Sequence, residues 1–115
     1  MNENNVVVLR GRVTVEPTHR ELASGAVVVQ FDLAVAEGTG TASVPVAWID
    51  PPSARIPVLD QEVVVLGSVR RRFFRAGGTT QSRTEVVAEQ VVGTTRRREV
   101  KRALAAAVPL LTLAD

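Results

Sequence analysis

Apolar and polar residues alternate over most of the chain, and the alternation divides it into five predicted strands. Side chains of an extended chain point to opposite faces in turn, so apolar residues at every second position indicate a strand with one buried face. The clearest run is 27–37, where valine, phenylalanine and leucine recur at the odd positions. The predicted strands are residues 5–15, 27–37, 42–49, 61–74 and 81–92, and residues 19–22 have the pattern of a further short strand.

Two segments outside these strands have helical features. Between the third and fourth strands, "DPPSARIP" (50–57) places Asp50 as an N-cap ahead of two prolines and leaves room for a turn or two of helix. Near the C-terminus, apolar residues recur at near-helical spacing from Val100 to Leu111, which predicts a short amphipathic helix to about residue 107. Three arginines at its start oppose the helix dipole, and a proline interrupts its far end.

The order of these elements favours one small all-β barrel. Five short strands with a single helical turn between the third and fourth are typical of a closed barrel, and 115 residues fit one core. We therefore predict a barrel domain over residues 1–93 and a basic, amphipathic tail over 94–115. Because every predicted strand precedes the tail, we expect the tail to be removable without unfolding the barrel.

Arginine dominates the charge of the chain, and its clustering matters more than the net charge. The sequence has 14 Lys and Arg against 12 Asp and Glu, a net charge of only +2, and Lys101 is the sole lysine. Arginines gather at 70–72 and 75 and again at 96–98, and a guanidinium presents a planar fork that fits phosphate. The absence of cysteine excludes disulfides and thiolate metal sites and fits a reducing, cytoplasmic setting. No apolar run is long enough to span a bilayer.

The stretch "GSVRRRFFRAGG" (67–78) joins arginines to two of the three phenylalanines in the chain. Strand alternation places Arg70, Arg72 and Phe74 on one face. Single-stranded nucleic acid needs cations for its phosphates and flat apolar platforms for its unstacked bases, and this face offers both. A solvated hairpin whose two rings cap the core explains the same stretch equally well. The arginines at 96–98 also have two interpretations: they form a solvated face, or they add further contacts to the phosphates of the nucleic acid.

No pattern in the sequence predicts catalysis. His19 is the only histidine and has no cysteine beside it, so we interpret it as a surface residue. Asp32 and Glu85 lie within predicted strands, where a lone carboxylate is typically a cross-strand ion-pair partner. The glycine pairs in the hairpin loops are too short to hold a phosphate chain. We therefore expect no enzyme activity, no cofactor, no metal, no small-molecule substrate and no membrane partner.

Several segments together resemble bacterial single-stranded DNA-binding proteins (SSB). "NVVVLRGRV" resembles the opening strand of that family, and the similarity continues through "EPTHRELASGAVVVQFDLAV". "VPVAWI" matches its third strand, "GSVRRRFF" its basic and aromatic strand, and "RTEVVAEQVV" its last strand. The resemblance covers about residues 4–92 and depends on the order and spacing of these segments rather than on any one of them.

The resemblance implies an OB-fold, a homo-tetramer or dimer, and sequence-tolerant binding of single-stranded DNA in replication, recombination or repair. A protein with that role is expected in the cytoplasm, at the nucleoid. The positions that match the binding surface of the family are Arg10, Arg12, Trp48, Arg70, Arg72 and Phe74. For Trp48, strand parity with Val44 and Val46 is compatible with a place in the core, but the resemblance favours an exposed stacking platform.

The chain also departs from the family pattern. The loop after the second strand is short, Ala42 stands where an aromatic is usual, and the helix after the third strand is reduced. The sequence ends in "LLTLAD" where the family has a linker and an acidic tip, which indicates a short paralogue. The alternative is an OB-fold protein-interaction module, a primosome-like accessory or an oligomeric scaffold. In either case we expect an oligomer, because three apolar residues fall on outward faces: Val8, Val64 and Leu66.

Overall fold

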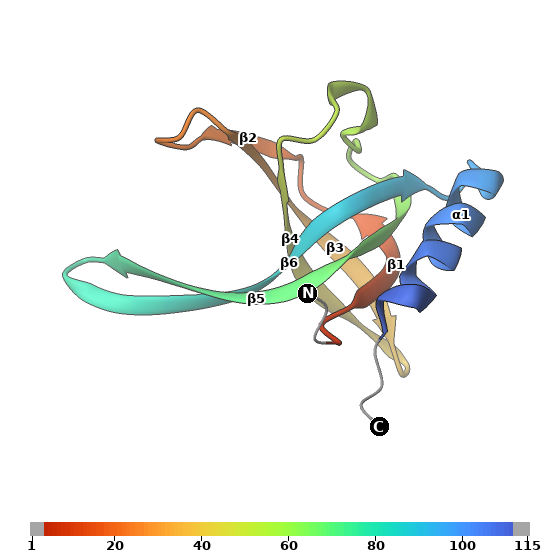
Figure 1. The fold of residues 1–115 in the computed structure, drawn as a ribbon. Helices are drawn as coiled ribbons and strands as arrows, with labels where there is room; N and C mark the ends of the chain where they lie inside the picture. The colour runs from red at the N-terminus through yellow and green to blue at the C-terminus, as the bar shows by residue number, and fades with distance from the viewer. Residues whose placement is uncertain (1–3, 112–115) are drawn as a thin grey trace.

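The computed structural model describes residues 4–111, which form a small barrel of strands, antiparallel except where β4 pairs with β6, with one helix against its side (Figure 1). The strands are β1 (Val7–Val13), β2 (Thr18–Glu21), β3 (Val27–Glu37), β4 (Gly40–Ile49), β5 (Glu62–Ala76) and β6 (Thr79–Gly93). The helix is α1 (Arg97–Ala107), and two single 3-10 turns are η1 (Ser53–Arg55) and η2 (Val108–Leu110). The last residues of the predicted tail, 112–115, lie outside the described residues.

Pairing of β1 with two neighbours closes the sheet into a barrel. The strand order is β1-β5-β6-β4-β3-β2, and β1 also pairs with β3, so five strands surround the core while β2 extends β3 outside it. Gly11 is the residue where β1 passes from β5 to β3, and a Cβ there would overlap the carbonyl oxygen of Ala34. The glycine is therefore needed for the close approach of two strands. The predicted class, an all-β OB-fold barrel, is confirmed.

The inward face of each barrel strand forms the core, as the alternation predicts. Along β3, Val29, Phe31 and Leu33 are all at most 2% exposed. The core cluster joins side chains of every barrel strand: Val13, Val29, Phe31, Leu33, Val46, Trp48, Val63, Val65, Val86, Ala88 and Val91. The apolar half of each alternating strand thus lies in one place, as expected for a sheet with one buried face.

The segment between β4 and β5 has the short helical turn that the sequence predicts, but Asp50 does not cap it. It contains only the 3-10 turn η1, whose N-cap residue is Pro52 and lacks a side-chain cap. Asp50 is not an N-cap: its φ is 49°, and its carboxylate accepts a hydrogen bond of 2.8 Å from the backbone N–H of Val27. That side chain holds the end of β4 against the start of β3, which the local sequence pattern could not reveal.

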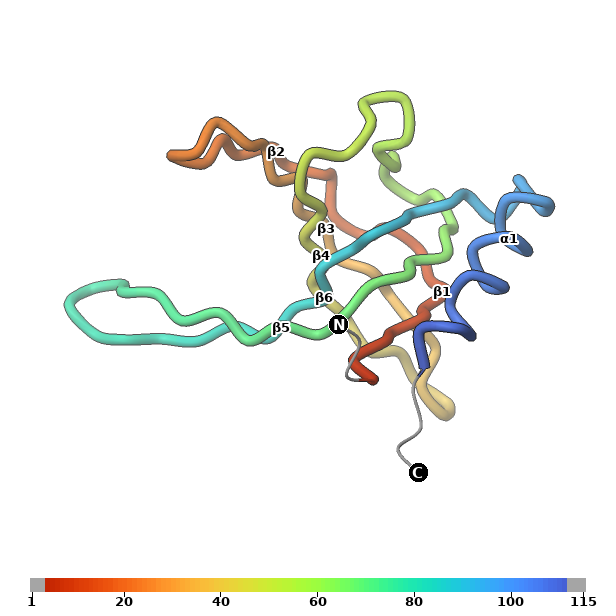
Figure 2. Tube along the Cα trace, in the orientation of Figure 1, coloured from red at the N-terminus to blue at the C-terminus, as the bar shows by residue number. Residues whose placement is uncertain are grey.

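β5 and β6 continue beyond the barrel as a two-stranded arm (Figures 1 and 2). We call residues 68–85 the arm, because over this span the two strands pair only with each other. The pairing runs to Ala76 and Thr79, so the predicted loop of six residues is a tight turn instead. Gly77 and Gly78 form its centre with φ of 60° and 83°, which are values that favour glycine and suit the twist of a hairpin.

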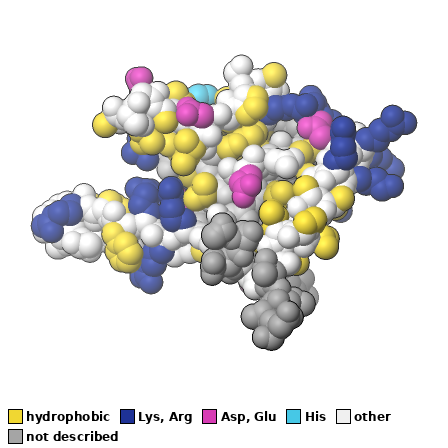
Figure 3. Space-filling model, viewed as in Figure 1, with side chains coloured by type: hydrophobic (Ala, Val, Ile, Leu, Met, Phe, Trp, Pro, Cys, Tyr) yellow, Lys and Arg dark blue, Asp and Glu magenta, His cyan; other side chains and the backbone are white. Residues whose placement is uncertain are grey.

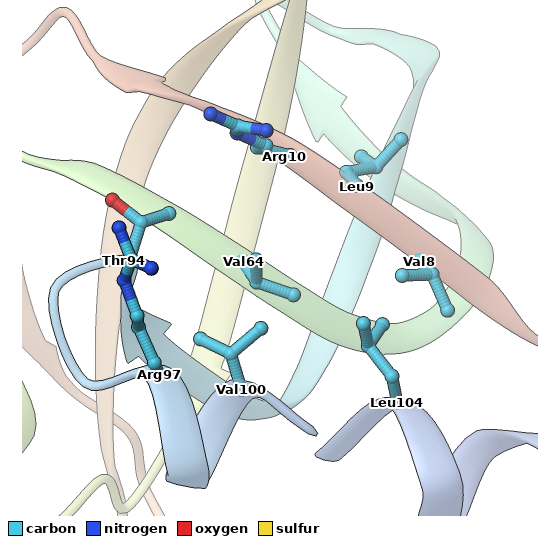
Figure 4. Close-up of a pocket in the computed structure, with 8 residues that line it drawn as sticks. All are labelled: Val8, Leu9, Arg10, Val64, Thr94, Arg97, Val100 and Leu104. Carbon is cyan, nitrogen blue, oxygen red and sulfur yellow. The ribbon is translucent and has the colours of Figure 1, made fainter. Parts of the chain in front are cut away.

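α1 packs across the outer face of the barrel over β5 and β6, with Ala103 and Ala107 buried (Figure 1). Its residues Val100 and Leu104 line a groove with Val64 of β5 (Figure 4). The helix begins without a side-chain cap. No helix within residues 4–111 has the length and apolar content to cross a membrane.

This position of α1 changes the interpretation of the outward apolar residues. Val64 and Leu66 are 6% and 3% exposed, so the prediction that they form an uncovered surface is wrong. The chain covers Val64 with its own helix, and Val92, which pairs with Val64 across β5 and β6, is 2% exposed. Of the three residues only Val8 remains open to solvent, at 43%.

Removal of α1 by ending the chain after Thr94 is expected to leave a folded but weaker barrel. The core cluster does not include residues of α1, so unfolding of the truncated chain should remain cooperative. Exposure of Val64 and Val92, partly offset by the helix no longer being ordered, should lower the free energy of unfolding by about 1–3 kcal/mol. Urea unfolding followed by far-UV circular dichroism measures this, and loss of the cooperative transition would show that α1 belongs to the folding unit.

Candidate nucleic-acid interface

The outer face of the arm carries the cations and the ring that the sequence predicts to lie together. Arg70, Arg72 and Phe74 alternate along β5, and their partners across the hairpin are Glu85, Arg83 and Gln81. Side chains of directly opposed residues share one face, so these six residues form one surface, which we call the outer face. It contains three arginines and one aromatic ring within a few residues of strand.

A single buried carboxylate organises two of these arginines. Glu85 is 2% exposed, and its Oε2 lies 2.6 Å from Arg70 Nη2 and 3.4 Å from Arg72 Nε. The expectation of a cross-strand ion-pair partner is confirmed, since Arg70 and Glu85 are directly opposed. The Arg70 and Arg72 side chains remain 42% and 29% exposed. Two guanidinium groups therefore share one carboxylate, which orients both and leaves one positive charge in excess.

Arg83 adds a further cation to the outer face. Its Nη2 lies 4.0 Å from Asp32 Oδ1 of β3, the limit of an ion pair, and its side chain is 45% exposed. An exposed pair at that separation contributes little stability and leaves the guanidinium free to bind another anion. Sequence reasoning missed this residue; its position opposite Arg72 in the hairpin register is the signal that would have found it.

Each face of the arm presents one phenylalanine with an arginine over its ring. On the outer face the Arg72 guanidinium carbon lies 5.2 Å from the centre of the Phe74 ring, and Phe74 is half-buried. On the opposite, inner face, Arg71 lies 5.6 Å from the Phe73 ring, and Phe73 is 67% exposed. The alternative that both rings cap the core is therefore wrong for Phe73. These distances suit cation–π contacts, which hold each ring in place.

Trp48 does not provide the stacking platform that the resemblance favours. It is 6% exposed and belongs to the core cluster together with Val46, on the inward face of β4. A base needs an exposed ring face on which to stack, and this ring is buried in the core. The prediction of an exposed Trp48 is wrong, and the strand parity with Val44 and Val46 was the more reliable signal.

Arg10 and Arg12 lie on β1 rather than on the arm. Arg10 Nε lies 3.2 Å from Glu62 Oε2, and Arg12 donates a hydrogen bond of 2.7 Å to the carbonyl oxygen of Asp60. The hydrogen bond from Arg10 holds the pKa of Glu62 below its usual value. Arg10 also lines the groove between β1 and α1 (Figure 4). Of the six predicted site residues, three therefore lie together on the arm, two lie on β1 and one lies in the core.

Within residues 4–111 no group of three or more His, Cys, Asp or Glu side chains is placed to hold a metal ion. His19 is exposed on β2, and its pairing with Val29 is through the backbone. Lys and Arg side chains instead gather at two ends of the molecule, over the arm and around α1 (Figure 3).

Comparison with known proteins supports the fold. A solved structure described as a Plasmodium falciparum SSB in complex with single-stranded DNA matches this chain with a TM-score of 0.64 and 22% sequence identity. The match covers 81% of this chain and 98% of that one. No protein-family model matches the sequence. No curated protein matches it either. At this identity the likeness is one of fold, and it agrees with the OB-fold that the strand pairing defines.

Proposed function

We propose that this chain binds single-stranded DNA, with little sequence preference, on the outer face of the arm. The observation that carries the proposal is the combination of Arg70, Arg72 and Phe74 on one solvent-facing surface. The guanidinium groups bind phosphates, and the Phe74 ring accepts a base. Each base–aromatic stack is worth about 1–3 kcal/mol, and every base has a flat face, so the contact tolerates any sequence.

Single-stranded rather than duplex nucleic acid fits this surface best. A base inside a duplex is already stacked on both sides, so it cannot use a protein ring without leaving its neighbours. The outer face has no helix or loop that would enter a groove, and its side chains follow a narrow two-stranded ribbon. The fold likeness to an SSB solved with single-stranded DNA supports this choice. On this proposal the chain protects exposed DNA during replication, recombination or repair, in the cytoplasm at the nucleoid.

Titration of fluorescently labelled oligo-dT by anisotropy at several salt concentrations tests the proposal. Three arginines on the outer face predict a slope of log K against log salt of about −2, from about 0.7 for each phosphate of a single strand. Duplex DNA of the same length is the control and should bind more weakly. Intrinsic tryptophan fluorescence is a poor readout here, because Trp48 is buried. Absence of oligo-dT binding at low salt would contradict the proposal.

A protein-interaction module is the second candidate, and the inner face of the arm favours it. Val69 and Phe73 lie there with exposures of 46% and 67%. The backbone of Val69 is held by Asn5, whose side chain both donates to its carbonyl oxygen and accepts from its N–H at 2.9 Å. A firmly placed apolar surface is typical of a protein contact. Such a contact would respond weakly to salt, whereas phosphate binding weakens steeply as salt rises.

We also expect the chain to form a homo-oligomer, either a dimer or a tetramer. Val8 on β1 and Val69 and Phe73 on the arm are apolar and at least 43% exposed. Burial of such residues against a second copy removes their surface from water, at roughly 25 cal/mol for each Å². Sedimentation equilibrium at micromolar concentration measures the mass of the particle. A monomer under those conditions would contradict the prediction.

A further inference from the structure

α1 divides into a packed side and a basic side. Its residues Val100, Leu104, Ala103 and Ala107 face the barrel, the last two 3% and 6% exposed. With 3.6 residues for each turn, the opposite side carries Arg98, Lys101 and Arg102 together with two exposed alanines, and Arg97 lies at its edge beside the groove. We call the four charged residues the helix cations: Arg97, Arg98, Lys101 and Arg102, all exposed. They account for much of the positive charge that Figure 3 shows at this end of the molecule.

The helix cations have no acidic partners among the described residues. The nearest carboxylate, Glu99, lies 2.7 Å from Arg55 and 3.6 Å from Arg96, so it is already shared by two other arginines. The hydrogen bond from Arg55 holds the pKa of Glu99 below its usual value, so that carboxylate is ionised and fully engaged at neutral pH. No ion pair within residues 4–111 involves a helix cation.

This arrangement weakens the helix rather than stabilising it. Arg97 and Arg98 stand in the first turn, where the helix dipole disfavours positive charge. Each of them also has a second cation four residues later, Lys101 and Arg102, and like charges at that spacing repel. An ordinary solvated helix face mixes charges of both signs. The helix cations destabilise α1 and have no acidic partner among the described residues to compensate. This arrangement points to a ligand that supplies the missing negative charge.

We infer that the helix cations form a second phosphate-binding surface for the same DNA strand that the arm binds. The inference rests on the proposed function and extends it. Val64, which α1 covers, lies on the same face of β5 as Arg70 and Arg72 of the outer face. Six residues of strand separate Val64 from Arg70, or about 20 Å. Figure 1 shows the arm at one end of β5 and α1 beside the other end, so a DNA strand that follows β5 away from the arm runs toward α1.

The chemistry of α1 favours nucleic acid over the other anionic partners. Three of the four helix cations are arginines, whose planar fork fits phosphate. The helix is about 16 Å long, which spaces the cations over several phosphates of an extended strand. A membrane surface would need a broad exposed apolar side, but on α1 only Leu104, at 42% exposed, is a large apolar residue open to solvent, while Ala103 and Ala107 are buried. The partner is therefore a flexible polyanion with regularly repeated charges.

Oligonucleotide length separates the two surfaces in an experiment. The test variant carries Arg98→Gln, Lys101→Gln and Arg102→Gln, and leaves Arg97, which lines the groove, in place. The probes are labelled oligo-dT of about 4 and about 30 nucleotides, the first too short to reach from the arm to α1. The variant should bind the short probe as the parent does. It should bind the long probe about 10–100-fold more weakly at moderate salt, with a salt slope smaller by about 2.

Two control variants make the result specific. Arg98→Lys with Arg102→Lys keeps every charge and should bind the long probe within about threefold of the parent. Arg20→Gln removes one exposed cation on β2, away from both surfaces, and should not change the binding of either probe beyond twofold or so. Thermal unfolding confirms that the variants remain folded, and the glutamine variant should be at least as stable because charge repulsion is relieved.

Each outcome decides between the inferences. Unchanged binding of the long probe by the glutamine variant overturns the second surface and leaves the proposed function intact. If the glutamine variant loses affinity equally for both probes, the substitutions act on the arm or on the fold, and the inference of a second surface is also overturned. If the parent binds neither probe, the proposed function fails as well. If the glutamine variant loses binding to poly-glutamate or to anionic vesicles but keeps DNA binding, α1 serves a protein or a membrane instead.

Discussion

Phe74→Ala is expected to weaken oligo-dT binding about 5–150-fold, while Phe73→Ala leaves it within about twofold of the parent. The two residues are neighbours in sequence and chemically identical, and each has an arginine over its ring at 5.2 Å and 5.6 Å. They differ in the face of the arm that they occupy. Phe73 is therefore a matched control for Phe74, and the pair tests which face binds DNA.

The expected difference arises from the charged residues that share a face of the arm with each ring. Phe74 shares the outer face with Arg70, Arg72 and Arg83, so a base stacked on it has phosphates within reach of three cations. Phe73 lies on the inner face with two arginines whose guanidinium groups are already bonded: Arg71 donates to the hydroxyl of Ser82 at 3.0 Å, and Arg75 donates to the carbonyl oxygen of Gly78 at 2.7 Å. Loss of the Phe74 ring removes a stacking contact but no charge, so the salt slope should stay unchanged.

The measurement is a salt series of anisotropy titrations with each variant, accompanied by thermal unfolding. If Phe73→Ala weakens binding and Phe74→Ala does not, the inner face is the interface and the proposal is wrong about the surface. If neither substitution affects binding at low salt, the arm is a solvated hairpin and the protein-interaction module becomes the better account. A variant of Arg72 is less informative alone, because its removal also disturbs Glu85, and Arg72→Gln should be combined with Glu85→Gln.

Trp48→Ala is expected to lower the free energy of unfolding by about 3–5 kcal/mol. Trp48 is the largest side chain of the core cluster and is 6% exposed, so its removal leaves a cavity that the rigid barrel fills only in part. A loss of that size is a large fraction of the stability of a small domain. Urea unfolding measures the loss. Val28→Ala, at a residue that is 5% exposed, is the comparison and removes a smaller side chain.

Trp48→Phe separates the core role from a stacking role. A phenyl ring keeps most of the packing, so stability should fall less than in the alanine variant, and oligo-dT affinity should stay within about twofold of the parent. If Trp48→Phe kept its stability but bound DNA ten or more times more weakly, the indole would be a contact for bases after all. Iodide should quench the fluorescence of the parent poorly, as expected for a buried indole.

Strand pattern alone predicted the barrel and the composition of the arm. Alternation identified the core side chains of β3, such as Phe31 and Leu33, and the shared face of Arg70, Arg72 and Phe74. These predictions succeed because side-chain direction along a strand depends only on local backbone geometry. For Trp48 the same parity indicated the core, and the resemblance to a family led away from it.

Contacts between distant segments required the tertiary structure. The length of the arm depends on where β1 and β4 stop pairing with β5 and β6, which no local pattern contains. The sharing of Glu85 by two arginines depends on hairpin register, and the burial of Val64 depends on where α1 docks. The sequence by itself determined which residues point the same way along each strand, because that is a local property of the chain. The tertiary structure alone decided which of those faces is covered, because cover comes from elements far away in sequence.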